Sequence, residues 1–433
     1  MKLPASARDR LERALAHIDD SLGEGARTFL TVYSETAYEA ADAADRRERR
    51  GIALGPLDGV IISIKDLFDV AGEPTRAGSK ALVDAPPAER DAPIVQRLRE
   101  AGAVIVGKTN MSEFAFTGVG ANPHYGTPRN PADPARVPGG SSSGAAVAVA
   151  HDMCEIAIGT DTGGSTRIPA ALCGVVGYKP TKNRVPTEGA FPLSPTLDSI
   201  GPLARSVGAC AVADAVLAGE HPWVLEPAAL KGLRLGIPQG LPLDDLDPSV
   251  ASRFEAAIGR LGRAGARLFE IQFSIFDDMA RVQSPATIAT VEAYLIHRER
   301  IAARGRDYDP IVRSRIETGS AVSAAGHAQM LKDRSKLVSA MDVELAEVDA
   351  LVLPTTPIVA PTMAEVSNVK GFNAANRLLL RNTAIANFFD LCAISLPMPG
   401  TGVMPAGLML FARRGQDRQL FAIAASVERL LIP

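Results

Sequence analysis

Hydrophobic positions along the chain repeat with two different periods, and the change between them separates helices from strands. Residues 6–19 and 34–50 are amphipathic with the period of a helix, so they predict two helices at the start of the chain. Short apolar runs rich in β-branched residues follow, and such runs are typical of strands buried in a sheet. These runs are residues 60–64, 104–106, 155–158 and 175–178.

Helical segments and further apolar runs alternate through the rest of the chain. Residues 93–101 predict a helix with Pro93 in its first turn and Asp91 placed to cap it. Further helices are expected at residues 248–264, 373–389 and 416–431, and a long helical region at residues 287–346. Further strands are expected at residues 233–237, 349–353 and 391–396.

Short buried strands that alternate with helices favour an α/β fold built on one largely buried sheet. The segment 219–231 is rich in proline and loop residues, and it has two interpretations: a domain boundary, or a long surface excursion within one domain. We favour the excursion, because no internal repeat or change of composition divides the chain. The expected architecture is therefore a single large domain.

Composition and charge exclude several classes of function. Of 433 residues, 46% are hydrophobic and 22% are charged, as in an ordinary globular protein, and the formal net charge is −3. Such a charge gives no general attraction to nucleic acid or to anionic membranes. The N-terminus lacks the apolar core of a signal peptide, and no run approaches the roughly 20 apolar residues of a membrane span. We expect a cytoplasmic protein that binds neither nucleic acid nor membrane.

The cysteines and the histidines offer no metal site. Four cysteines show neither a paired spacing nor a metal-like spacing with histidine, so buried free thiols are expected, and we expect no metal and no cofactor. The cysteines are Cys154, Cys173, Cys210 and Cys392.

Two stretches of the chain combine glycine and serine at unusual density. Residues 138–144 read PGGSSSG, and residues 159–169 read GTDTGGSTRIP. Ordering so many glycines costs conformational entropy, so the glycines serve either tight turns or the close approach of backbone N–H groups to a ligand. Because two such stretches each present serines, catalysis is favoured over turns alone.

Two short motifs elsewhere match by spacing but fail on structural context. Residues 102–109 fit the phosphate-binding pattern GxxxxGKT, yet the four residues that should wrap a phosphate are themselves an apolar strand. Residues 367–370 fit the SxxK pattern without its companion motifs, so chance explains the match.

The nucleophile-elbow pattern GxSxG at residues 140–144 fails for a similar reason. That elbow requires a hydrophobic strand leading into the serine, and a proline-broken loop precedes it here. It also requires a histidine base, whereas His221, His297 and His327 lie in contexts that do not suggest one. A serine hydrolase without histidine can use a lysine instead.

Lys65 is the best candidate for such a lysine, because it ends the apolar run at residues 60–64 and burial would lower its pKa. A second interpretation stays open, in which Lys65 pairs with Asp66 or extends to the surface. The residues alone also leave open which serine is the nucleophile. The candidates are Ser141, Ser142, Ser143 and Ser165.

Residues 139–181 strongly resemble the amidase signature family. They contain a GGSS loop, a GTDxGGSxR segment and a following GxKPT, and the similarity extends over about residues 50–210. The resemblance implies a central mixed β-sheet covered by helices on both faces. It makes residues 1–433 one domain, in which helices at 1–50 precede the signature core and residues 232–433 complete the sheet and the substrate pocket.

The resemblance also implies a Ser–cis-Ser–Lys triad. The serine of the GGSxR segment is Ser165, which would be the nucleophile of an acyl-enzyme. The first serine after the paired glycines is Ser141, and the lysine after the upstream strand is Lys65. The implied oxyanion hole consists of backbone N–H groups at Thr162, Gly163, Gly164 and Ser165. Supporting hydrogen bonds are expected from Ser142, Asp161 and Arg167.

Family membership implies hydrolysis of a C–N bond without fixing the substrate. We expect a small amide, anilide or carbamate as substrate and a monomer or homodimer. The alternative is a glutamine-hydrolysing amidotransferase subunit that acts in a complex. Met111, Phe114, Phe116 and Tyr125 follow the strand at Lys108 and are candidates for an apolar pocket, although core packing is expected for at least two of them.

Overall fold

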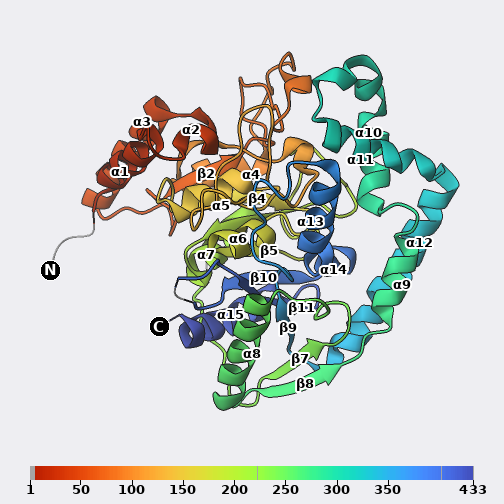
Figure 1. The fold of residues 1–433 in the computed structure, drawn as a ribbon. Coiled ribbons are helices and arrows are strands. Elements are labelled where there is room, and N and C mark those ends of the chain that lie inside the picture. The colour runs from red at the N-terminus through yellow and green to blue at the C-terminus, as the bar shows by residue number, and fades with distance from the viewer. Residues whose placement is uncertain (1–4, 222, 401, 433) are drawn as a thin grey trace.

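A mixed sheet of 11 strands runs through the molecule in this computed structural model, which describes residues 5–221, 223–400 and 402–432 (Figure 1). The strands in spatial order are β1 (Phe29–Val32), β3 (Val104–Thr109), β2 (Ile61–Lys65), β4 (Ile156–Asp161), β6 (Ser199–Ala204), β5 (Val176–Lys179), β10 (Cys392–Pro397), β11 (Gly407–Ala412), β9 (Ala350–Pro354), β7 (Arg234–Pro238) and β8 (Arg267–Ile271).

The sheet is parallel at two places and antiparallel between them. Strands β3, β2 and β4 run parallel, as do β9, β7 and β8, while every pair from β4 through β6, β5, β10 and β11 to β9 is antiparallel. Every residue of β2, β3 and β4 is buried, because helices cover both faces of these strands. This burial explains why their sequences are almost continuously apolar.

Helices cover the two faces of the sheet in separate groups. One face packs against α1 (Ala7–Asp19), α3 (Ser34–Arg49), α5 (Ser143–Ala150) and α6 (Arg167–Cys173), with the short α2 (Gly25–Thr28) beside them. The other face packs against α4 (Pro93–Glu100), α7 (Val207–Ala218), α8 (Pro248–Arg263) and α15 (Asp417–Leu431). Ile62 and Ile64 of β2 face this second group, so Lys65 points toward the first.

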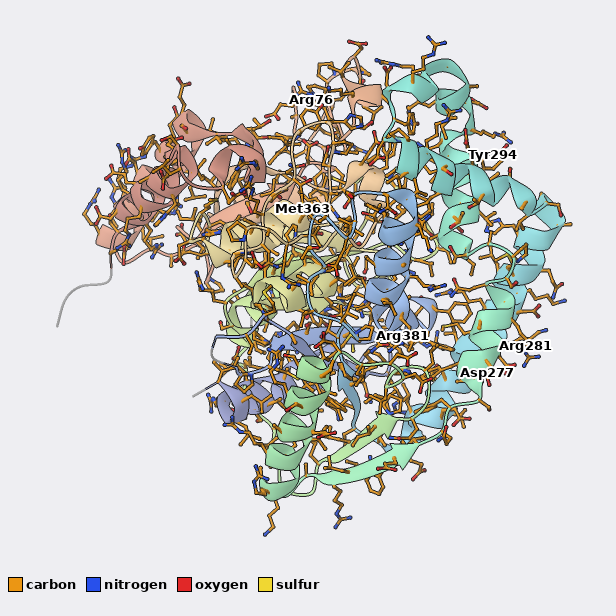
Figure 2. All side chains as sticks on the ribbon, viewed as in Figure 1. Arg76, Asp277, Arg281, Tyr294, Met363 and Arg381 are labelled. Carbon is orange, nitrogen blue, oxygen red and sulfur yellow. The ribbon has the colours of Figure 1, made fainter. Side chains whose placement is uncertain are left out.

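An arm of helices connects β8 to β9 along one side of the molecule (Figure 1). It consists of α9 (Ile275–Val282), α10 (Ile288–Arg304), α11 (Pro310–Glu317) and α12 (Ala324–Glu344). Exposed side chains such as Asp277 and Arg281 mark its outer rim in Figure 2. Two more helices, α13 (Val369–Arg381) and α14 (Thr383–Phe388), lie between β9 and β10 in the chain.

The remaining helical elements are single short turns. They are η1 (Lys80–Leu82), η2 (Glu113–Ala115), η3 (Gly305–Asp307), η4 (Thr318–Ala321) and η5 (Leu345–Glu347). Within the residues described, no helix has both the length and the apolar content needed to cross a bilayer.

The structure confirms a single α/β domain with a mixed central sheet, and it corrects several local expectations. The region 287–346 is three helices, because Asp309 and Ser323 begin new helices by capping their N-termini. Asp91 does not cap α4; its Oδ1 accepts from the backbone of Ala71, and Ala92 occupies the cap position. In segment 219–231, Ala228 donates its N–H to α15, so this part of the segment lies along that helix.

Four strands were not expected from the pattern: β1, β6, β8 and β11. Strand β6 reads SIGPLA, in which glycine and proline interrupt the run, and β11 reads GLMLFA, which contains no β-branched residue. Strand β8 lies at the edge of the sheet and is largely exposed, which removes the continuous apolar run. These strands form through pairing with neighbours that are distant in sequence.

The first residue of α15 fastens this helix to the middle of the sheet. The carboxylate of Asp417, which is 3% exposed, accepts hydrogen bonds from the hydroxyl of Tyr178 at 2.6 Å and from the backbone and side chain of Thr181 at 2.8 and 2.6 Å. Buried hydrogen bonds to a charged group are worth more than exposed ones, because the alternative is an unsatisfied polar group away from water.

We therefore expect Asp417→Ala to lower the free energy of unfolding by about 3 kcal/mol, since the buried hydroxyl of Tyr178 loses its acceptor. Urea denaturation followed by circular dichroism measures this loss. The control is Asp342→Ala, which removes a surface ion pair to Arg414 and should cost less than about 1 kcal/mol. Equal losses in the two variants would contradict this account of α15.

Candidate active site

Lys65 lies fully buried at the end of β2 and contacts two hydroxyl groups. Its Nζ donates to Ser141 Oγ at 2.7 Å and to Thr160 Oγ1 at 2.8 Å. Thr160 belongs to β4, which runs parallel to β2, so the ends of the two strands meet at this point. The alternative pairing of Lys65 with Asp66 is not observed, because the carboxylate of Asp66 accepts from the backbone of Gly78 at 2.9 Å.

The environment of Lys65 favours its neutral form. Burial lowers the pKa of Lys65 from its ordinary value to about 7, although the negative charges of Asp161 and Asp198 act in the opposite direction. No carboxylate in the described part of the chain forms an ion pair with this ammonium group. A large fraction of Lys65 is therefore unprotonated near neutral pH, and in that form the amine can accept a proton.

The three consecutive serines lie in the loop before α5 and in its first turn, and each has a different position. The Gly140–Ser141 peptide bond is cis, and the carbonyl of Ser141 accepts from the backbone of Ser112 at 3.1 Å. The Oγ of Ser142 donates to the carbonyl of Thr160 at 3.3 Å. The Oγ of Ser143 is buried without a hydrogen-bond partner in the described structure. Of the three, Ser141 is the serine that contacts the lysine.

Ser165 lies in the turn that leads from β4 into α6, at the wall of a cavity. It is 4% exposed, and its Oγ makes no hydrogen bond within the described residues, so it is free to meet a ligand. The carbonyl of Ser165 accepts from the backbone N–H of Ser142 at 3.2 Å. This bond holds the two serine-rich loops side by side.

A buried carboxylate organises the loop that carries Ser165. Asp161 Oδ1 accepts from Gly164 N at 2.8 Å and from Arg167 Nη2 at 2.9 Å, and Oδ2 accepts from Arg167 Nε at 3.0 Å. Asn387 of α14 donates to Oδ1 at 2.8 Å. Burial alone would raise the pKa of Asp161, but Arg167, Lys179 and Asn387 lower it well below the usual range. Asp161 is therefore an anion at every physiological pH.

Some of the backbone N–H groups expected to form an oxyanion hole beside Ser165 have no hydrogen-bond acceptor in the described structure, but the N–H of Gly164 has one. Gly164 donates its N–H to Asp161, so that group is already engaged and does not face a ligand. The N–H groups of Gly163 and Ser165 have no hydrogen-bond acceptor in the described structure. Gly164 has a φ of +135°, and a Cβ there would lie 2.2 Å from Thr383 Oγ1, so only glycine fits at this position.

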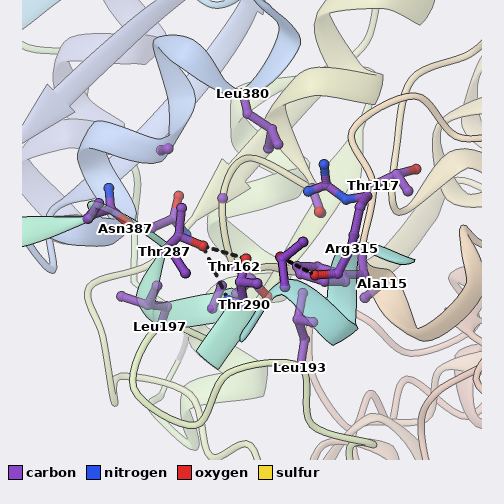
Figure 3. A pocket seen from close by; sticks show the side chains of 18 of the residues that line it. Ala115, Thr117, Thr162, Leu193, Leu197, Thr287, Thr290, Arg315, Leu380 and Asn387 are labelled. Carbon is purple, nitrogen blue, oxygen red and sulfur yellow. Dashed lines mark hydrogen bonds between the residues drawn. The ribbon is translucent and has the colours of Figure 1, made fainter. Parts of the chain in front are cut away.

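The cavity at Ser165 has a volume of about 490 Å³, which suits a small molecule (Figure 3). Its walls come from segments far apart in the chain, including η2, the segment 193–197, and helices α10, α11 and α14. Its apolar lining residues include Phe116, Leu193, Leu197, Leu380 and Phe388, and its polar ones include Thr117, Thr162, Thr287, Thr290 and Arg315.

Three of the pocket candidates lie elsewhere. Met111 and Phe114 are buried in the core, where Phe114 packs against Phe191 and His297, and the hydroxyl of Tyr125 donates to the carbonyl of Ser79. None of the three lines the cavity at Ser165, and Phe116 does. Of the three, only Phe114 belongs to η2, where its backbone has a φ of +50°.

Several residues at the site were not singled out in the sequence. Thr160 directly precedes Asp161 in the glycine-rich stretch, so its position at the end of the strand could have identified it. Asn387 and Arg315 are more than a hundred residues from Ser165, and only the folded chain brings them to it. Among the described residues, no cluster of three or more His, Cys, Asp or Glu side chains is arranged to hold a metal ion.

Comparisons with known proteins agree with this geometry. The family model described as Amidase matches residues 12–421. The 2-amino-5-chloromuconic acid deaminase of Comamonas testosteroni is 37% identical, over 99% of this chain and 95% of the relative. One component of the glutamyl-tRNA(Gln) amidotransferase of Chloroflexus aggregans is 34% identical, over 93% of this chain and 89% of the relative.

A solved structure described as the crystal structure of amidase has a TM-score of 0.88 and 34% identity, and the match covers 99% of this chain and 96% of that one. Sequence and fold therefore agree over almost the whole length. The chain belongs to the amidase family, whose members carry the amidase signature, and it is a hydrolase that cleaves amide C–N bonds.

Proposed function

We propose that the protein hydrolyses a small amide, anilide or carbamate through an acyl-enzyme on Ser165, with Ser141 and Lys65 as its proton relay. The observation that carries this proposal is the 2.7 Å hydrogen bond from the buried Lys65 to Ser141, beside the cavity that holds Ser165. A lysine with a pKa of about 7 can serve as a base at neutral pH.

In the first step, neutral Lys65 accepts the proton of Ser141, and Ser141 accepts the proton of Ser165. The Oγ of Ser165 then bonds to the carbonyl carbon, and the carbonyl oxygen becomes an oxyanion. We assign its stabilisation to the N–H groups of Gly163 and Ser165, because neither has an acceptor in the described structure. Loss of one such donor typically costs about 3 kcal/mol of transition-state stabilisation.

In the second step, the C–N bond breaks and the relay returns its proton to the leaving nitrogen. Water then attacks the ester carbonyl on Ser165 with Lys65 again acting as base, and the acid is released with Ser165 restored. Asp161 and Arg167 support both steps, because their hydrogen bonds to Gly164 and Asn387 fix the loop from which Ser165 projects.

The second candidate is an amidotransferase component that hydrolyses glutamine in a complex. The similarity to the amidotransferase of Chloroflexus aggregans favours it. The segment 189–198 favours a free-standing hydrolase instead, because its Leu193 and Leu197 give the cavity apolar walls that suit a small molecule. We place the enzyme in a reducing cytoplasm as a monomer or homodimer, a proposal that its four free, buried cysteines support.

The pH dependence of hydrolysis tests the role of Lys65. Because the base must be unprotonated and burial lowers its pKa to about 7, kcat/KM should fall about tenfold per pH unit below pH 7 and level off above it. Stopped assays of an anilide between pH 5.5 and 9 measure this dependence.

Lys65→Ala should lose activity by about 10³-fold or more and recover part of it at high pH. Full activity in that variant would refute the role.

Labelling with a fluorophosphonate tests the identity of the nucleophile. We expect one adduct on Ser165, detected by mass spectrometry of tryptic peptides, and no adduct in Ser165→Ala. The matched control is Ser143→Ala, because the Oγ of Ser143 has no hydrogen-bond partner in the described structure and its loss should leave labelling unchanged. An unlabelled wild-type protein would contradict the acyl-enzyme.

Assays of the purified chain alone separate the two candidate functions. A free-standing hydrolase should cleave small amides, anilides or carbamates without additions. Glutaminase activity that appears only when partner proteins are added would instead establish the amidotransferase function.

A further inference from the structure

The cavity at Ser165 contains a single charged side chain among the described residues. Of the residues that line it, Arg315 of α11 alone carries a charge, and the others are apolar, hydroxyl or amide residues. Figure 3 shows its side chain extending from the helix into the cavity, with its guanidinium on the side of Thr117. The guanidinium lies 4.9 Å from the centre of the Phe116 ring, and Phe116 also lines the cavity.

No anion within the described part of the chain compensates this charge. Arg315 takes part in no ion pair there, and its Nε is buried without a hydrogen-bond acceptor. Burial lowers the pKa of Arg315, yet arginine keeps its proton in proteins, so a cation remains in a partly desolvated place. Such a charge destabilises the fold unless something pairs with it, so a half-buried arginine without a partner requires an explanation.

Arg313, on the same helix, shows how an arginine at the surface is usually paired. Arg313 Nε donates to Glu317 at 2.8 Å in an i,i+4 pair at the surface. Helix α11 therefore carries two arginines, one paired in solvent and one unpaired in the cavity. The contrast indicates that the position of Arg315 serves the cavity and not the stability of the helix.

We propose that Arg315 binds a carboxylate on the substrate, so that the enzyme acts on small amides that also carry an acid group. A guanidinium matches a carboxylate through two parallel N–H···O bonds, and this geometry is strongest where water is excluded. The aromatic face of Phe116 holds one side of the guanidinium and leaves its nitrogens for the ligand. The inference rests on the proposed hydrolysis at Ser165 and names its substrate class.

The residues that line the cavity also favour a substrate that carries an acid group. A cavity of about 490 Å³ with apolar walls and one cation would accept a short hydrocarbon chain that ends in an acid. An amine on the substrate would meet a like charge, because none of the described lining residues is acidic. An uncharged amide would leave Arg315 without a partner.

The test uses the monoamides of dicarboxylic acids with three to six carbons, from malonamate to adipamate. Each is compared with the uncharged amide in which an isopropyl group replaces the carboxylate. For at least one pair, the wild-type protein should hydrolyse the acid with a kcat/KM about 100-fold higher or more. Equal rates within every pair, with measurable hydrolysis, would overturn the inference while leaving the proposed function intact.

Variants at the two arginines provide the matched comparison. Arg315→Met should lower kcat/KM for the acid by about 100-fold and so remove most of the preference for the acid over the uncharged amide, and Arg315→Lys should recover part of that preference. Arg313→Met should leave both substrates unchanged, because Arg313 pairs with Glu317 outside the cavity. An equal loss on both substrates in Arg315→Met would show a structural role and overturn the inference.

A binding measurement separates this inference from the proposed chemistry. In Ser165→Ala, calorimetric titration with the same monoamides should show binding that Arg315→Met abolishes when combined with it. Fluorophosphonate labelling of Ser165 in Arg315→Met should proceed as in the wild type. Binding that persists without Arg315 would overturn the inference, whereas an unlabelled Ser165 in the wild-type protein would count against the proposed function instead.

Discussion

The arrangement of the site depends on one buried ion pair, between Asp161 and Arg167. Asp161 ends strand β4 and Arg167 begins helix α6, so the pair closes the turn that holds Ser165 between them. Asn387 joins the pair from α14 and couples the signature loop to the C-terminal part of the chain. Both charges are fully buried, so each needs the other as its ion-pair partner. The turn therefore has little freedom to adopt another conformation.

Two other cations lack such an ion-pair partner in the described structure, the fully buried Lys65 and the half-buried Arg315. Lys65 has no carboxylate partner in the described structure and contacts only hydroxyl groups, so burial lowers its pKa and favours a neutral amine that can accept a proton. Arg315 also lacks a carboxylate partner there, but arginine does not give up its proton, so its charge remains available to a ligand. Burial thus has a different consequence for each cation, according to its pKa and its partners.

The site around the cavity is built from segments that lie far apart in the chain. The signature core supplies Lys65 and Ser141, which share a hydrogen bond, and the loop with Ser165, whose carbonyl accepts from the backbone of Ser142. The helical arm and α14 supply most of the cavity walls, Arg315 among them. The signature core thus supplies part of the cavity wall, and segments far downstream supply the rest.

The sequence by itself determined the fold class and most of the buried strands, because these depend on local periodicity. The choice of Lys65, Ser141 and Ser165 came only with the family resemblance, since the residues alone left four serines open. The sequence did not determine the edge strand β8 or the strands β6 and β11, since these form only by pairing with distant strands. Of the four pocket candidates that followed the strand at Lys108, Met111, Phe114 and Tyr125 lie elsewhere, and the tertiary structure has only Phe116 at the cavity. Only the folded chain could place Arg315 there, because its position comes from the packing of an arm about 150 residues downstream of Ser165, and no local pattern encodes that contact.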